Sequence, residues 1–225
     1  VRNELIKFNK VFETKGSAAI LMNVNNGEIL SLVSLPDYDL NQRVAITENI
    51  YTNKITLGVY ELGSVFKTFT IAAGLESKAI RSDTIFKNLE NSIRCDKHII
   101  SEHDQLPKSL SVEQILVRSS NIGSVKIAQK IGLENYKKFL NSLALFKKIN
   151  FDLEEVGVPL SFNWGKCKLA TASFGRGITT TPLQLVRAYA ILGNGGFEIE
   201  PFILKGKNGL GKKGKQIIST ETSQT

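Results

Sequence analysis

Apolar and polar positions alternate with clear periods in the first third of the chain. Residues 3–16, NELIKFNKVFETKG, carry apolar side chains at roughly helical spacing and end at a Lys-Gly pair, which predicts an opening helix. Two short apolar runs, SAAILMNV and EILSLVSL, then flank Asn25-Asn26-Gly27, whose residues tolerate positive φ and favour a tight turn. These runs predict a β-hairpin, followed by a polar loop through about Asn53.

From residue 64 onward the apolar pattern is mainly helical. The predicted helices are Ser64 to Ser77, Ser111 to Ile131, Glu134 to about Leu143, and Pro182 to Leu192. Ser111 is typical of an N-cap, and a short helix capped by Ser219 is predicted near the end. The stretch 150–168 predicts a loop. Since no internal repeat or strong linker divides the chain, we expect one domain with two intertwined lobes.

Composition places the chain among ordinary globular proteins. It has 225 residues, of which 42% are hydrophobic and 22% charged, and a formal net charge of +8. That charge favours an anionic neighbour, but the lysines are scattered, and the Gly/Lys stretch 205–215 is typical of a solvated loop. Because no basic run is interleaved with aromatic residues, we predict no nucleic-acid binding.

Cysteine and histidine residues give no definite site. Cys95 and Cys167 lie far apart without a CxxC pattern, so they could pair or stay free. His98 and His103, with Glu102 beside them, could be read as a metal site. Histidines beside acids in a loop are far more often plain surface residues, so we assign them no metal and no cofactor.

The segment YELGSVFKTFTIAAGLE places a hydroxyl and an amine on an otherwise apolar helix. Ser64 and Lys67 are three residues apart and share one helix face, so we expect their side chains to approach hydrogen-bonding distance. Apolar surroundings lower the pKa of a lysine, which makes Lys67 a candidate base for a Ser64 nucleophile. Gly63 leaves space for a substrate carbonyl. Alone, an S-x-x-K pattern is weak, because about one occurrence is expected by chance in such a chain.

A second polar group stands at the front of an apolar run in VRSSNIGSVKIA. Ser119 offers a hydroxyl that can pass a proton to a leaving amine, and Asn121 offers an amide for a substrate carbonyl or a lysine. Alone, an S-x-N triplet is mostly turn or cap chemistry. Its position after the S-x-x-K segment favours a catalytic interpretation.

Four segments in order resemble the transpeptidase domain of class B penicillin-binding proteins, with the division type most similar. They are GSAAILMNVNNGEILSLVSLPDYDLN, YELGSVFKTFTIAAGLE, VRSSNIG and SFGRGITTTPLQLVRAYAILGNGG, and the similarity runs from about Lys15 to Phe202. The resemblance implies an α/β (α+β) fold like that of serine β-lactamases and D,D-peptidases. It has an antiparallel sheet flanked by helices and a mostly helical lobe, here at about 78–165 of a domain spanning 1–225. Only the first hairpin of that sheet is expected in this chain.

The same resemblance implies a role for each matching residue. Ser64 is the nucleophile acylated by the D-alanyl-D-alanine end of a wall stem peptide, and Lys67 accepts its proton. Ser119 relays a proton to the leaving amine, and Asn121 orients the substrate amide and Lys67. The residues with an implied part in substrate binding are Gly63 and Ser120. No metal or cofactor is implied.

The implied partners are peptidoglycan stem peptides, β-lactam antibiotics, and membrane proteins of division or elongation. The implied location is the extracytoplasmic face of the bacterial cytoplasmic membrane, with an anchoring span expected upstream of Val1. The chain departs from the family at Leu62, where a proline is common, and its third motif, K-T-G, is expected beyond the last residue.

Two other functions stay open. One is a serine β-lactamase, which needs an acid to activate the deacylating water, and no such acid can be placed from the sequence. The other is a penicillin-sensing module or an inactive remnant of a transpeptidase, for which the expected absence of the third motif is the main support.

Overall fold

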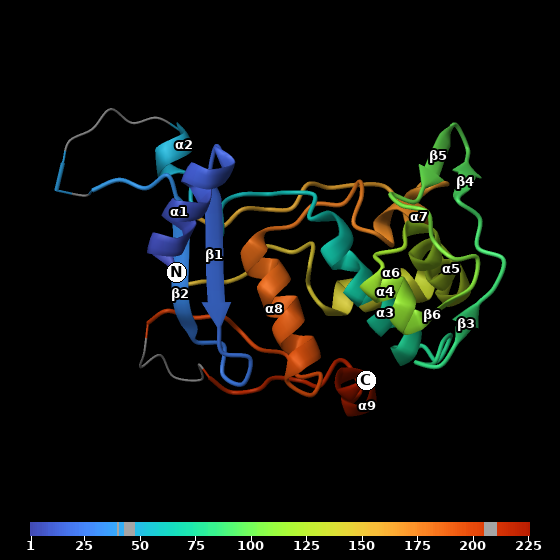
Figure 1. Cartoon of the computed structure of the whole chain (residues 1–225). Helices are drawn as coiled ribbons and strands as arrows, with labels where there is room; N and C mark the ends of the chain where they lie inside the picture. Colours follow the sequence, from blue (N-terminus) through green and yellow to red (C-terminus); the bar gives the residue numbers. More distant parts are fainter. Residues whose placement is uncertain (40, 43–47, 205–210) are drawn as a thin grey trace.

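The computed structural model describes the chain from residue 1 to residue 225, except residue 40 and residues 43–47 and 205–210. Figure 1 shows a β-hairpin at one end, helix α8 beside it, and a cluster of helices beyond α8. The predicted polar loop and the Gly/Lys stretch lie partly outside the described residues.

The N-terminal part follows the hydrophobic pattern closely. Helix α1 (Arg2–Phe12) is followed by strands β1 (Ser17–Met22) and β2 (Ile29–Leu35), which pair antiparallel. The predicted opening helix and hairpin are therefore confirmed. A short helix, α2 (Glu48–Tyr51), was not predicted, because one helical turn leaves no period in the sequence.

The predicted helix at 64–77 begins as a tighter turn than expected. Residues Gly63–Phe66 form a 3₁₀ helix, η1, which continues into helix α3 (Lys67–Glu76). The predictions for helices α6 (Leu133–Ser142) and α8 (Pro182–Gly193) are confirmed within a residue or two of their ends.

The predicted single helix from Ser111 to Ile131 is wrong, since the chain breaks it in two. Helix α4 (Val112–Val117) begins at a capping box made by Ser111, and helix α5 (Asn121–Ile131) begins after three intervening residues. Ser119 lies between them with φ at +53°, a left-handed conformation that a helix does not allow. The Ser120 hydroxyl then accepts a hydrogen bond from Gly123 N and starts α5 afresh.

The sequence pattern did not predict several short elements, because each is only a few residues long. Strands β3 (Ile85–Phe86) and β6 (Leu110–Ser111) pair antiparallel, as do β4 (Ser92–Cys95) and β5 (His98–Ser101). The stretch around His98 is therefore a hairpin and not the loop predicted. Helix α7 (Lys168–Ala172) was also missed, whereas the predicted Ser219-capped helix, α9 (Thr220–Gln224), is confirmed.

The core lies where α3 crosses α5, and it fixes the start of both helices. Phe66, Phe69 and Ile122 are fully buried there, and burying each such side chain stabilises the fold by about 1.5–3 kcal/mol. Thr70 Oγ1 is 2.8 Å from Tyr136 Oη and 2.7 Å from Ser173 O, which ties α3 to α6 and to the segment after α7. The helices that carry the candidate site are therefore held rigidly.

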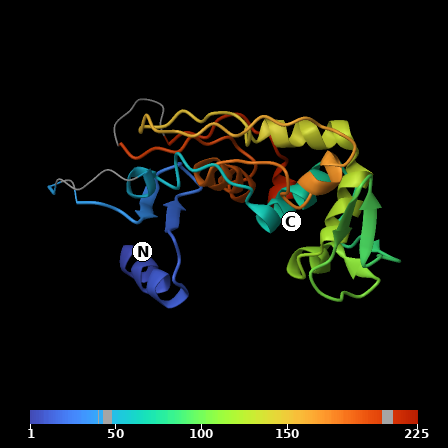
Figure 2. The ribbon, with the colours of Figure 1, turned by 90° about the horizontal axis from the view of Figure 1, so that it is seen from above.

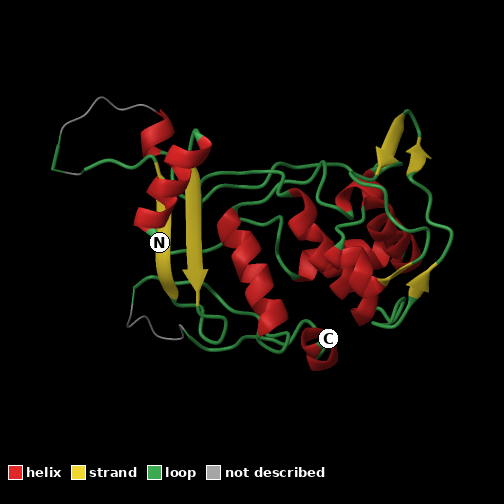
Figure 3. Ribbon diagram, viewed as in Figure 1, coloured by secondary structure: helices red, strands yellow, loops and turns green. Residues whose placement is uncertain are grey.

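The whole molecule is elongated. Seen from above in Figure 2, the β1–β2 hairpin and the β4–β5 hairpin lie at opposite ends of the molecule. The secondary-structure colouring in Figure 3 shows strands at both ends of the molecule and most of the helices between them. Among the described residues, no helix is both long and apolar enough to cross a membrane.

Candidate active site

The turn at residues 63–66 presents Ser64 to solvent at the start of α3. Gly63 has φ at +61°, which favours glycine, and no atom lies within 4 Å of the place where its Cβ would be. Gly175 packs closely behind this turn, because a Cβ on Gly175 would lie 2.1 Å from Gly63 O. The sequence therefore supplies glycine both where the turn needs positive φ and where a second segment supports it.

Lys67 points inward from the same turn, and its side chain is only 1% exposed. Its amine donates a hydrogen bond to Ser119 Oγ at 2.9 Å and another to the Ser119 carbonyl. Burial lowers the pKa of Lys67 to about 8, although the negative charge of Glu102 acts in the opposite direction. The structure contains no hydrogen bond between Lys67 Nζ and Ser64 Oγ, because the amine is engaged by Ser119.

The turn between α4 and α5 carries the second group of predicted residues. Asn121 Nδ2 donates to Ser101 O at 2.9 Å, which fixes the amide beside strand β5. Ser120 is fully buried, and its hydroxyl donates to Glu102 and accepts from Gly123 N. The expected contact of Ser120 with substrate does not fit this position, since its hydroxyl is used inside the protein.

Ser64, Gly63 and Asn121 open onto one cleft of about 690 Å³. The other residues that line it are Glu61, His98, Ile99, Ile100, Ser101, His103, Thr171, Phe174, Gly175 and Arg176. Most of these come from strand β5 and from the segment around α7. Phe174, Gly175 and Arg176 belong to the fourth segment of the family resemblance, but the sequence did not indicate that these residues or strand β5 would line the cleft, because they reach it only through tertiary folding.

A disulfide joins the two walls of this cleft. Cys95, at the end of β4, is bonded to Cys167, directly before α7, and their Cα atoms are 5.7 Å apart. The sequence left this pairing open. The bond tethers the β4–β5 hairpin to the segment that contains Thr171 and Arg176.

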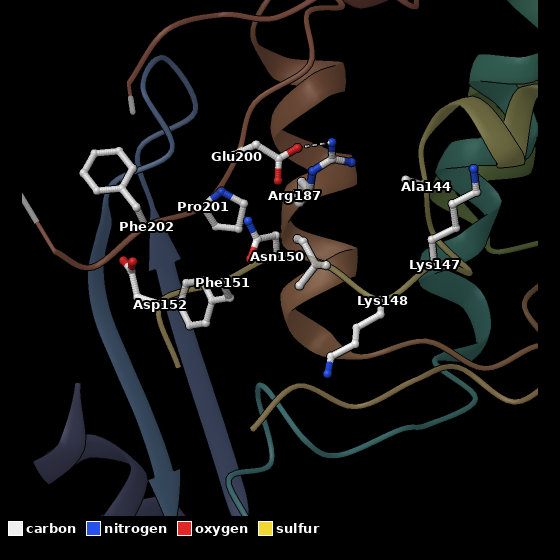
Figure 4. A pocket seen from close by; sticks show the side chains of 11 residues that line it. Ala144, Lys147, Lys148, Asn150, Phe151, Asp152, Arg187, Glu200, Pro201 and Phe202 are labelled. Atoms are coloured by element: carbon white, nitrogen blue, oxygen red, sulfur yellow. Dashed lines mark hydrogen bonds and ion pairs between the residues drawn. The ribbon is translucent and has the colours of Figure 1, made fainter. Parts of the chain in front are cut away.

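A second cavity, of about 400 Å³, lies away from Ser64 and Lys67, near α8 and the β1–β2 hairpin. Figure 4 shows Arg187 facing Glu200, and their side chains form an ion pair with Nη2 and Oε1 2.7 Å apart. In the same view the side chains of Lys147 and Lys148 do not reach this ion pair. This cavity holds neither Ser64 nor Lys67, so it is not part of the candidate active site.

Comparison with known protein families decides the relationship. The model of the penicillin binding protein transpeptidase domain matches residues 17–225. The chain belongs to this family. The predicted resemblance to penicillin-binding transpeptidases is thereby confirmed.

Relatives and solved structures agree with this assignment. The chain is 32% identical to the probable peptidoglycan D,D-transpeptidase FtsI of Caulobacter vibrioides over 99% of its own length. It is 34% identical to the peptidoglycan D,D-transpeptidase FtsI of Buchnera aphidicola over its whole length. It spans 38% and 40% of those two relatives, or about two fifths of their length.

The fold expected of a penicillin-binding transpeptidase is also confirmed. A solved structure described as the TP domain of penicillin-binding protein 3 from Burkholderia pseudomallei superposes with a TM-score of 0.85. It is 24% identical in sequence and covers 99% of this chain and 63% of its own. The α/β fold of helices and small antiparallel sheets is therefore that of this family.

Proposed function

We propose that the protein is a peptidoglycan D,D-transpeptidase that cross-links stem peptides at division through an acyl-enzyme on Ser64. We further propose that residues 1–225 belong to one transpeptidase domain, with a helical lobe at about 78–165. The single observation that supports this function best is an exposed Ser64 that lines one cleft with Asn121, one turn before a buried Lys67 whose amine donates to Ser119 Oγ, in a chain of this family.

The proposed first step forms an ester on Ser64. Its Oγ attacks the carbonyl carbon of the penultimate D-alanine while Lys67, in its neutral form, accepts the hydroxyl proton. The C–N bond then breaks, and the terminal D-alanine leaves as an amine that takes a proton. The 2.9 Å hydrogen bond from Lys67 Nζ to Ser119 Oγ supplies a route for that proton.

The proposed second step regenerates the enzyme. An amine of a neighbouring stem peptide attacks the Ser64 ester, a new amide bond forms, and Ser64 recovers its proton. In this proposal Asn121 orients the substrate amide from the wall of the cleft that it shares with Ser64. A β-lactam acylates the same oxygen, because its strained amide takes the place of the D-alanyl-D-alanine bond.

The proposed location is the extracytoplasmic face of the bacterial cytoplasmic membrane. The Cys95–Cys167 disulfide supports it, since disulfides persist in the periplasm and other oxidising surroundings and are rare in the cytosol. The proposed substrate, the peptidoglycan stem peptide, would be present at this location as well.

The test is labelling of the full-length natural protein with a fluorescent penicillin, followed by intact-mass analysis. We expect one stable adduct on Ser64, and Ser64→Ala should lower the labelling rate at least about 10³-fold, because the nucleophile is removed. The matched control is Ser109→Ala, which removes an exposed serine outside the cleft and should label like the wild type. An adduct on any other residue would overturn the proposal.

The same labelling, combined with an assay of stem-peptide cross-linking, separates the alternatives. Rapid release of hydrolysed drug would indicate a serine β-lactamase. A stable adduct without cross-linking of stem peptides would indicate a penicillin-sensing module, and absence of any adduct would indicate an inactive remnant.

A further inference from the structure

Glu102 is the residue on which the second wall of the cleft converges, although it lies outside every motif in the sequence. It follows strand β5 directly and accepts three hydrogen bonds from the start of α5. Oε1 accepts from Ser120 Oγ at 2.6 Å and from Ile122 N at 3.0 Å, and Oε2 accepts from Asn121 N at 2.7 Å. Both carboxylate oxygens are therefore used to hold one turn.

This arrangement gives α5 an acidic cap from a distant part of the chain. Backbone N–H groups at a helix start have no partner within the helix, and a negative charge there is favourable. The preceding residue, Ser101, adds a fourth contact, because its carbonyl accepts from Asn121 Nδ2. Glu102 and Ser101 at the end of β5 thus accept hydrogen bonds from the backbone and from the side chain of Asn121, respectively.

The turn that Glu102 holds is also the turn that receives the lysine. Ser119 offers Lys67 both its hydroxyl and its carbonyl, and it does so with φ at +53°, a conformation that neighbouring contacts must maintain. A shift of Ser120 would move Ser119 with it. The position of the Lys67 amine therefore depends on the carboxylate of Glu102.

We propose that Glu102 is a positioning residue of the active site, whose carboxylate fixes the Ser119–Asn121 turn and thereby sets the place of Lys67 relative to Ser64. The proposal rests on the function proposed above. It assigns the β4–β5 hairpin a task in acylation, since this hairpin delivers the carboxylate.

The charge of Glu102 supports the same inference. Its attraction raises the pKa of Lys67, against the larger effect of burial. The other titratable or charged groups that line the cleft are Glu61, His98, His103 and Arg176. Removal of the Glu102 charge alone should lower the pKa of Lys67 further, whereas removal of an exposed carboxylate elsewhere should not.

The test compares Glu102→Gln and Glu102→Asp with a control, Glu90→Gln, which changes an exposed glutamate on the approach to β4. The acylation rate of the full-length natural protein with fluorescent penicillin is measured from pH 6 to pH 10. We expect Glu102→Gln to lower the maximal rate about 10–100-fold and to move the midpoint of the pH profile to lower pH. Glu102→Asp keeps the charge with a shorter reach, so it should lower the maximal rate and leave the midpoint in place.

A second readout does not depend on activity. The titration of Lys67 is followed by NMR through its ¹³Cε resonance, and Glu102→Gln should lower the midpoint while Glu90→Gln leaves it unchanged. A purely structural role would lower the melting temperature and the rate but would not move either midpoint, and that result would overturn the proposal. If the wild type forms no adduct, the proposed function fails, and the NMR titration still decides the role of Glu102.

Discussion

The amine of Lys67 is the group whose neutral form the candidate chemistry requires at the start. Burial lowers its pKa from 10.5 to about 8, so about one tenth of the molecules carry a neutral amine at pH 7. The lowered folded-state value means that the unfolded chain binds more protons between pH 8 and 10.5. The contribution of Lys67 to stability therefore improves as pH rises through that window.

The acylation rate should follow the neutral fraction of this amine. We expect the rate constant with penicillin to rise about tenfold per pH unit below pH 8 and to level off above it, because deprotonated Lys67 is the proposed base. Stopped-flow fluorescence of the full-length natural protein measures this profile. Lys67→Arg should abolish acylation, since arginine keeps its proton throughout this range. A rate that does not change between pH 6 and pH 9 would contradict the assignment of the base.

At the scale of elements, the β4–β5 hairpin buries Ile100 in the core and is held to the helical body by further contacts at two points. Hydrogen bonds from the start of α5 reach Ser101 and Glu102 at one end of the hairpin, and the disulfide holds Cys95 at the end of β4. A two-stranded hairpin is marginal without such support. The position of this wall of the cleft therefore depends on these contacts.

Removing the covalent attachment should loosen this wall. The double variant Cys95→Ser, Cys167→Ser opens a loop whose ends are 72 residues apart, and we expect it to lose about 2–4 kcal/mol of stability. Its acylation by penicillin should slow as well, since Ser101 and Glu102 move with the hairpin. Urea unfolding and labelling with and without dithiothreitol provide the measurement. Dithiothreitol should weaken the wild type and leave the double variant unaffected, and equal stability of the two proteins would argue against the clamp.

At the scale of the whole molecule, the sequence predicted the elements that have a regular local pattern of apolar residues. It did not predict the features that depend on tertiary contacts. Regular hydrophobic patterns mark the first hairpin and the helices at 64–77 and 182–192. These elements could therefore be predicted from local sequence, without knowledge of the segments that pack against them. The break at Ser119 was not predictable, because the turn is held by contacts of Ser119 with Lys67 and of Ser120 with Glu102, which come from other segments. The order of the motifs pointed to Ser64 and Lys67, but no spacing in the sequence links Glu102 to residues 18 to 20 positions later.

The open side of the β1–β2 hairpin predicts how these 225 residues behave in isolation. Within the described part of the chain β1 pairs with β2 alone, and Leu21 on β1 is 53% exposed. Unpaired strand edges with apolar side chains promote association between copies. We expect sedimentation equilibrium to show concentration-dependent self-association that Leu21→Lys weakens. The control Leu160→Lys, in an exposed loop, should have little effect, and a strictly monomeric wild-type chain would contradict this expectation.

The close approach of Gly175 to Gly63 has a consequence for the evolution of drug resistance. A variant can reshape the cleft at Thr171 or Arg176, whose side chains line it. At position 175 any side chain would collide with the main chain of Gly63, directly before Ser64. In the function proposed above, a substitution of Gly175 would therefore also disable acylation of Ser64, so resistance to β-lactams is not expected to arise at that position.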